Sequence, residues 1–157
     1  MFEQTVYLRP LQVEDAKISW RWRNDASLWK YTGSRPNCEV TEAMECAWAE
    51  RITQDLTRIN YAICLSPSND YIGNIYLVNI HEGVGELGIF IGNRDAHGKG
   101  YGTQALKALI EVAKTQYNMK KIKIGVSREN KSAMAVYIKC GAILIDDAPW
   151  STLEIDL

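Results

Sequence analysis

Short stretches of the chain alternate between apolar and other residues, and a period of two is typical of strands that bury one face. The clearest case is Ile122, Ile124 and Val126, which are separated by lysine and glycine. Turn-forming residues stand between the stretches. The pattern predicts strands at Thr5–Arg9, Arg58–Leu65, Tyr71–Ile80, Gly85–Gly92, Lys121–Ser127, Ala142–Ile145 and Thr152–Ile155.

Other stretches repeat apolar residues every three or four positions, which is typical of a helix with one buried face. The best example is the set Leu106, Leu109, Ile110, Ala113 and Tyr117. The pattern predicts helices at Val13–Asn24, Thr41–Gln54, Thr103–Asn118 and Ser132–Cys140.

The predicted elements follow the order β-α-α-β-β-β-α-β-α-β, with a further short strand at the end. This order is typical of an α/β or mixed α+β fold, in which helices cover the faces of a mixed sheet. We expect six to seven strands and about four helices. A chain of 157 residues has the size of one domain, so a single domain over residues 1–157 is predicted.

The composition of the chain excludes some classes of binding partner. The net charge is −1 and no basic block occurs, which argues against nucleic acid or an anionic membrane as the main partner. No apolar run approaches the roughly 18 residues of a membrane span. The beginning of the chain lacks a signal-peptide pattern, and the four cysteines are scattered without a Cys-x-x-Cys pair. We therefore expect a cytoplasmic protein with reduced thiols.

The most informative segment is the glycine-rich turn between the strand Gly85–Gly92 and the helix that begins near Thr103. Its sequence is His97-Gly-Lys-Gly-Tyr-Gly-Thr103. A turn at a helix N-terminus presents unpaired backbone N–H groups, which favour a phosphate. Three glycines in five residues cost about 1 kcal/mol each relative to alanine. A ligand that needs close backbone approach explains this cost better than tight packing does.

Two well-known phosphate loops fit this turn poorly. A P-loop needs four residues between its first glycine and the Gly-Lys pair, but five separate Gly92 from Gly98, and Gly100 stands where Ser or Thr is required. A Rossmann turn is compatible with Gly100-Tyr-Gly102-Thr-Gln-Ala105. That fold also needs an acidic residue at the end of the next strand, and the strand Lys121–Ser127 has none.

The turn resembles the pyrophosphate loop of the GCN5-related N-acetyltransferase (GNAT) superfamily, usually written Gln/Arg-x-x-Gly-x-Gly/Ala. Gly100 and Gly102 match the two small positions, whereas His97 replaces Gln or Arg. A second stretch, from Asn130 through Tyr137 to Gly141-Ala, resembles the family's Asn…Tyr…Gly-Phe segment. The resemblance extends from about residue 70 to 145. The sub-pattern Gly98-Lys-Gly-Tyr-Gly-Thr-Gln-Ala105 also resembles the branch that contains ribosomal-protein N-terminal acetyltransferases and many small-amine acetyltransferases.

The resemblance implies acetyl-CoA as co-substrate and no metal. The pantetheine arm then lies along the backbone of the strand before the turn, and Asn130 forms a hydrogen bond with it. The residues implied in holding the coenzyme are Ile89, Phe90, Ile91, His97, Gly98, Lys99, Gly100, Tyr101, Gly102, Thr103 and Asn130.

The resemblance also implies catalytic roles. Tyr137 matches the family tyrosine that protonates the leaving thiolate. Glu86, early on the strand before the turn, is the best-placed general base, and His81 and His97 are alternatives. The expected reaction is direct acetyl transfer to a primary amine through a ternary complex.

The acceptor site is expected on the first two helices and their loop, at Trp20, Arg23, Asn24 and Tyr31. The stretch Trp-Arg-Asn-Asp resembles family members that act on amino sugars, including nucleotide-linked ones. Arg21, Arg23 and Arg35 have the chemistry to bind phosphate or carboxylate. Other small amines and protein N-termini remain alternatives, as does a non-catalytic coenzyme A-binding module. A homodimer also remains open.

Overall fold

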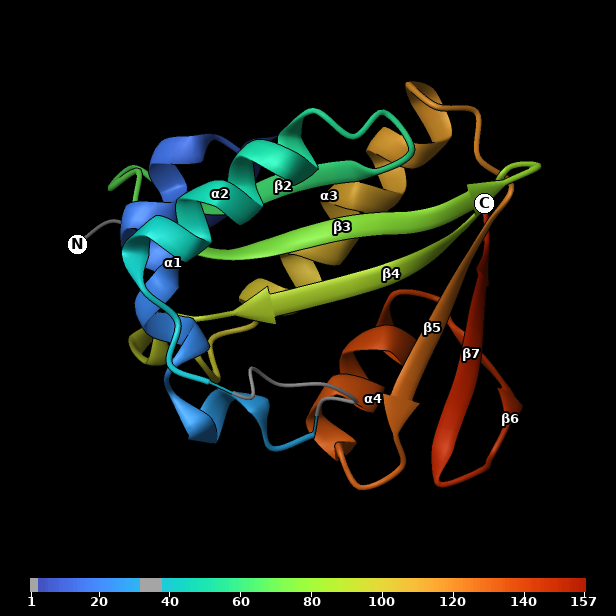
Figure 1. Ribbon diagram of the computed structural model, residues 1–157. Helices are drawn as coiled ribbons and strands as arrows, with labels where there is room; N and C mark the ends of the chain where they lie inside the picture. The colour runs from blue at the N-terminus through green and yellow to red at the C-terminus, as the bar shows by residue number, and fades with distance from the viewer. Residues whose placement is uncertain (1–2, 32–37) are drawn as a thin grey trace.

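The computed structural model describes residues 3–31 and 38–157. Over these residues a seven-stranded sheet forms the centre of the molecule (Figure 1), in the spatial order β1-β2-β3-β4-β5-β7-β6. The strands are β1 (Thr5–Pro10), β2 (Ile59–Ser66), β3 (Tyr71–His81), β4 (Val84–Ile91), β5 (Lys121–Ser127), β6 (Ile143–Asp146) and β7 (Trp150–Asp156).

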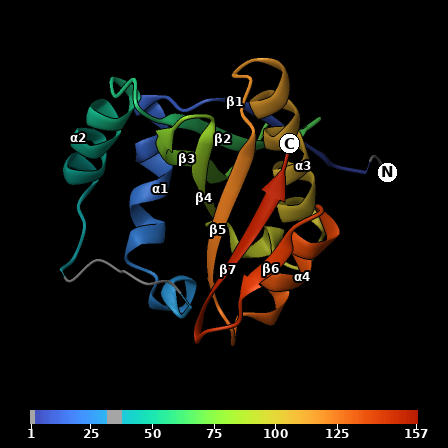
Figure 2. The same ribbon diagram turned by 90° about the vertical axis from the view of Figure 1, so that its right-hand side faces the viewer.

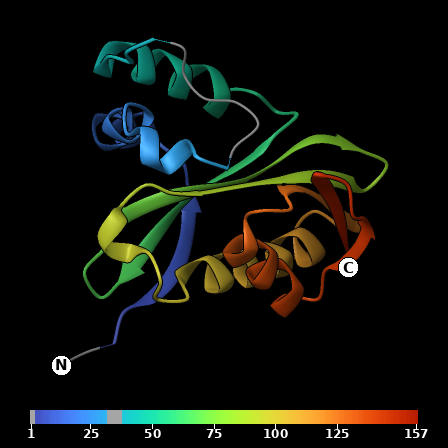
Figure 3. The ribbon, with the colours of Figure 1, turned by 90° about the horizontal axis from the view of Figure 1, so that it is seen from below.

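Helices cover both faces of the sheet. They are α1 (Ala16–Arg23), α2 (Glu42–Thr53), α3 (Tyr101–Thr115) and α4 (Lys131–Lys139), with short 3-10 turns η1 (Val13–Asp15), η2 (Ala26–Trp29) and η3 (Arg94–Ala96). Helices α1 and α2 lie on one face, and α3 and α4 lie on the other (Figures 2 and 3). The predicted mixed fold and its element order are confirmed.

The sheet splits between its two central strands. β4 and β5 run parallel, but they pair only from Val84 to Glu86 against Lys121 to Lys123. Beyond this point the two strands diverge (Figure 1). Residues 87–91 of β4 therefore have no strand partner on that side among the described residues. Backbone N–H and C=O groups that lack a strand partner are ready to pair with another extended chain.

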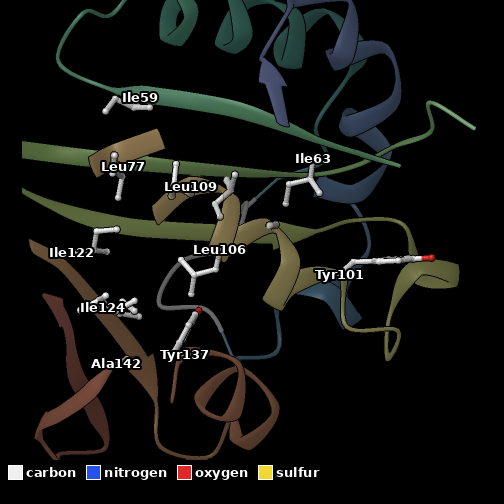
Figure 4. Close-up of a cluster of buried hydrophobic side chains, with 14 of the residues drawn as sticks. Ile59, Ile63, Leu77, Tyr101, Leu106, Leu109, Ile122, Ile124, Tyr137 and Ala142 are labelled. Carbon is white, nitrogen blue, oxygen red and sulfur yellow. The ribbon is translucent and has the colours of Figure 1, made fainter. Parts of the chain in front are cut away.

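The main core lies between the sheet and α3 (Figure 4). Leu106 and Leu109 of α3 and Ile63, Ile75 and Ile122 of the sheet are completely buried. Burial of such a side chain stabilises the fold by about 1.5–3 kcal/mol. The helix ends at Thr115, so Tyr117 lies beyond it and is 48% exposed. Its predicted place on the buried helical face is wrong, because its position is no longer helical.

A second, smaller core lies between the sheet and the helices α1 and α2. The ring of Trp22 packs against the rings of Tyr71 and Phe90, with centroids 4.9 and 6.3 Å away. Gly92 makes room for it, because a Cβ atom built there would lie 1.9 Å from Cδ2 of Trp22. The glycine thus lets the helix α1 approach the end of β4.

The substitution Gly92→Ala is expected to lower the free energy of unfolding by about 1–3 kcal/mol, because the new methyl group overpacks the Trp22 contact. Denaturant unfolding measures the effect. Gly102→Ala is the matched control, since a Cβ atom there meets no atom within 4 Å. Equal stability of Gly92→Ala and the wild type would contradict the packing of Trp22 on this glycine.

No helix of the described chain has the length and apolar character needed to cross a membrane.

Candidate active site

Two adjoining cavities open where β4 and β5 diverge. One, of about 510 Å³, is called the tryptophan cavity; its walls include Arg23, Trp29, Trp48, Arg58, Tyr76 and Trp150. The other, of about 490 Å³, is called the glycine-turn cavity; its walls include His97, Gly98, Gly100, Tyr101, Gly102 and Ala133. The two share Tyr31, Ile89, Phe90, Asn130 and Tyr137. These shared residues stand where the two spaces meet.

The glycine turn opens α3 in the geometry of an anion site. Gly98 and Gly100 have φ angles of +74° and +81°, which side chains rarely tolerate. Gly100 is the N-cap of α3 and makes no side-chain cap, so the first helical N–H groups are open. Together with the positive end of the helix dipole, these groups favour a phosphate in the glycine-turn cavity.

The three glycines are not explained by tight packing. A Cβ atom built on Gly98, Gly100 or Gly102 meets no atom within 4 Å. By contrast, built Cβ atoms on Gly88 and Gly92 lie 2.0 and 1.9 Å from aromatic rings. Gly102 is also helical, so backbone conformation does not demand glycine there. The positive φ angles account for glycine at positions 98 and 100, whereas neither packing nor backbone conformation accounts for Gly102.

His97 connects the glycine turn to the strand β4 that precedes it. Its Nε2 atom and the carbonyl oxygen of Ile91 are 2.8 Å apart. The ring thus links the glycine turn to the last residue of β4. Two other predicted residues lie outside both cavities: Lys99 is exposed to solvent, and the Thr103 carbonyl accepts from the Cys140 thiol at 3.7 Å.

Asn130 lines both cavities and also caps a helix. Its Oδ1 atom accepts from the backbone N–H of Ala133 and the hydroxyl of Ser132, each at 3.3 Å. It is therefore the N-cap of α4. Its side-chain amide nitrogen makes no hydrogen bond with the described residues, so this donor is open to a ligand.

Tyr137 is one of two ionisable side chains in the wall of both cavities, and Tyr31 is the other. Its side chain is 7% exposed and extends from α4 (Figure 4). The hydroxyl makes no hydrogen bond with the described protein. Burial, with a smaller contribution from the nearby Tyr76, raises the pKa of Tyr137 to about 12. The phenol is thus neutral near pH 7 and able to donate a proton.

The predicted bases lie away from this point. Glu86 is exposed and belongs to the walls of neither cavity; its carboxylate accepts from Nδ2 of Asn79 at 2.8 Å. His81 is an exposed residue near the β3–β4 turn, where it lies 3.7 Å from Glu82. The Nε2 of His97 already contacts the Ile91 carbonyl. No carboxylate of the described chain lines the tryptophan cavity.

The predicted acceptor residues divide into two groups. Arg23 lines the tryptophan cavity and Tyr31 lines both cavities. Trp20 and Asn24 line neither of them. The Asn24 amide instead pairs with both backbone groups of Val40 at 2.8 Å, and so joins the end of α1 to the segment before α2. Arg35 lies outside the described residues.

Several wall residues were absent from the sequence prediction. Arg58, Tyr76 and Trp150 come from separate parts of the chain and meet only through the register of the sheet. The sequence does hold one indication of this wall, namely a tyrosine on one strand and a glycine on the next. In the structure Tyr76 of β3 pairs with Gly88 of β4. A large ring opposite a glycine is a recognisable arrangement once the register is known.

Comparison with known families gives a match over most of the chain. The model for "Acetyltransferase (GNAT) domain" matches residues 5–143. An uncharacterized N-acetyltransferase, p20, of Bacillus licheniformis is 24% identical over 136 residues, covering 83% of this chain and 74% of that protein. Spermidine N(1)-acetyltransferase of Escherichia coli K12 is 26% identical over 137 residues, covering 87% and 72% of the two chains.

Solved structures share the fold. The crystal structure of spermidine N-acetyltransferase from Vibrio cholerae, in complex with CoA and spermine, superposes with a TM-score of 0.83. The two sequences are 19% identical, and the match covers 97% of this chain and 95% of the other. At this identity the likeness concerns the arrangement of helices and strands.

Proposed function

The chain belongs to the GNAT acetyltransferase family and is an acetyl-CoA-dependent N-acetyltransferase, and we propose that it transfers the acetyl group directly to a small primary amine in a ternary complex. The single observation that carries this proposal is the position of Tyr137 in the wall that the two cavities share. A thioester in the glycine-turn cavity and an amine in the tryptophan cavity would meet beside its hydroxyl.

Each cavity supplies a different part of the reaction. The N–H groups of the glycine turn and α3 hold the pyrophosphate, and the unpaired edge of β4 pairs with the pantetheine arm. The neutral amine attacks the thioester carbonyl, the nitrogen of the tetrahedral intermediate loses one proton to water, and the carbon–sulfur bond breaks to leave the amide. Tyr137 then donates its proton, or a hydrogen bond, to the leaving sulfur.

The wall of the tryptophan cavity has no carboxylate or histidine to deprotonate the amine among the described residues. We therefore propose that the acceptor loses its proton to water before it attacks. An alkylamine of pKa about 10 is neutral about once in a thousand molecules at pH 7. The rate should consequently rise with pH until the amine is neutral.

A panel of primary amines tests the proposal, with release of the coenzyme thiol as the readout. We expect thiol release that requires both acetyl-CoA and an amine, with the acetylated amine as product. Spermidine and a protein N-terminal peptide belong in the panel, since relatives act on spermidine and the branch resemblance includes N-terminal acetyltransferases. Binding of acetyl-CoA with no transfer to any amine would favour a non-catalytic coenzyme A-binding module.

A further inference from the structure

The wall of the tryptophan cavity is unusually one-sided in charge. Two guanidinium groups, those of Arg23 and Arg58, line it, whereas no described Asp or Glu does. Most of the other wall residues are aromatic or aliphatic. A cavity of this composition repels a polycation and attracts an anion.

Arg58 is held in place without a carboxylate. Its Nε atom donates to Oδ1 of Asn60 at 3.3 Å, and its guanidinium carbon lies 5.1 Å from the centre of the Tyr76 ring. The Tyr76 ring in turn lies across Gly88, where a Cβ atom would be 2.0 Å from it. The terminal nitrogens of Arg58 have no hydrogen-bond partner among the described residues. These donors are oriented and unused.

Arg58 forms no ion pair with a carboxylate among the described residues. The charge of Arg58 contributes to lowering the pKa of Asp55, but the larger cause is that the hydroxyl and the backbone N–H of Thr57 donate hydrogen bonds to the Asp55 carboxylate. Asp55 forms no ion pair with Arg58 and lies outside the cavity wall. The positive charge of Arg58 therefore faces the cavity.

Arg23 adds a second set of oriented donors. Its Nε atom contacts both oxygens of the buried Glu45, at 3.1 and 3.0 Å. Its guanidinium lies 4.4 Å from the Trp48 ring and 5.4 Å from the Trp29 ring. Its terminal nitrogens make no hydrogen bond with the described protein. Glu45 balances the charge of Arg23 and fixes its orientation, while the terminal N–H groups stay available.

We propose that the acceptor amine carries an anionic group, a phosphate or a carboxylate, which Arg58 binds with the help of Arg23. The planar guanidinium matches both groups because it offers parallel N–H donors. The amine then extends toward Tyr137, which lines the same cavity. The inference rests on the proposed acetyltransferase function and separates this chain from its spermidine-acetylating relative, whose substrate is a polycation.

Matched amines test the inference in the wild-type protein. Ethanolamine and phosphoethanolamine differ only in a phosphate, as do glucosamine and glucosamine 6-phosphate. β-Alanine presents a carboxylate, and spermidine presents only positive charge. We expect the phosphorylated amines to exceed their unphosphorylated partners in kcat/KM, or β-alanine to exceed ethanolamine, by about tenfold or more and chiefly through KM. Comparison of phosphoethanolamine with β-alanine identifies which anion is preferred.

The substitution Arg58→Gln tests the residue. We expect the ratio of kcat/KM between the anionic amine and its neutral reference to fall by about tenfold or more. Arg58→Lys should restore part of the ratio, because lysine keeps the charge but loses the planar donors. Arg51→Gln is the matched control: Arg51 is exposed on α2 and outside the cavity wall, so the ratio should not change. Thermal unfolding of each variant verifies the fold.

The outcomes separate this inference from the proposed function. Absence of transfer to every amine would overturn the proposed function. Transfer to spermidine or to neutral amines at or above the rate for the anionic ones would overturn the anion site alone. An unchanged ratio in Arg58→Gln would also overturn the role of Arg58.

Discussion

Replacement of Tyr137 by phenylalanine is expected to lower kcat by about a hundredfold and leave KM for acetyl-CoA nearly unchanged, because a positioned proton donor contributes about 10²–10⁴ to the rate. The change removes only the hydroxyl. That hydroxyl has no hydrogen-bond partner in the described protein, so its loss should leave stability unchanged. Steady-state kinetics and thermal unfolding of the same samples measure the two effects.

The matched control is Tyr117→Phe, because Tyr117 lies past the end of α3 and outside both cavities. It should retain wild-type kinetics. A Tyr137→Phe variant with unchanged kcat, under conditions where acetyl transfer limits the rate, would remove this residue from the chemistry. Loss of activity together with loss of stability would instead indicate a structural role.

The elevated pKa of Tyr137 affects how it acts. Transfer of a proton from a phenol of pKa about 12 to a free thiolate of pKa about 8.5 costs about 5 kcal/mol. The same burial disfavours the thiolate, so the pKa of the leaving thiol also rises in the occupied site and the cost falls. The role that we propose for Tyr137 is therefore a hydrogen bond that becomes proton transfer as the bond to sulfur breaks.

The pH profile follows from the same value. A group with a pKa of about 12 stays protonated as the pH rises from 7 to 10, so Tyr137 causes no loss of activity over this range. The fraction of acceptor amine in the neutral, reactive form increases with pH. The rate should therefore rise with pH up to the pKa of the amine and then remain level.

The second large effect is expected at the glycine turn, where Gly102→Val should raise the Kd for acetyl-CoA at least about tenfold without unfolding the protein. No protein atom lies within 4 Å of a Cβ at this position, so the new side chain has room in the free protein. It occupies the space that we assign to the pyrophosphate. Valine is also no worse than glycine in a helix.

Thermal shift measures this change directly. Ligand at about 100 times its Kd stabilises the folded state by about 2.7 kcal/mol, which for a domain of this size raises Tm by about 5–10 °C. The wild type should show this rise, and Gly102→Val should lose most of it at the same concentration. Gly102→Ala should show a smaller loss. An undiminished shift in Gly102→Val would contradict the placement of the pyrophosphate.

Much of the fold was predictable because local patterns encode it. Alternation at Ile122, Ile124 and Val126 predicted β5, and the three residues are indeed buried. Helix ends were harder, as α3 begins at Tyr101 and not at Thr103. The reason is that Gly102 has low helix propensity, and the tertiary fold overrides it.

The chain by itself determined the donor side. The glycine turn before a helix and the Asn130–Tyr137 stretch are short sequence motifs, and their resemblance to the GNAT family predicts acetyl-CoA without any knowledge of packing. Only the tertiary structure decided which side chains join Arg23 and Tyr31 in the wall of the tryptophan cavity. Arg58 comes from the segment before β2, Tyr76 from β3 and Arg23 from α1, and Glu86 of β4 lies outside both cavities. Strand register and helix docking are long-range properties, and hydrophobic periodicity does not encode them.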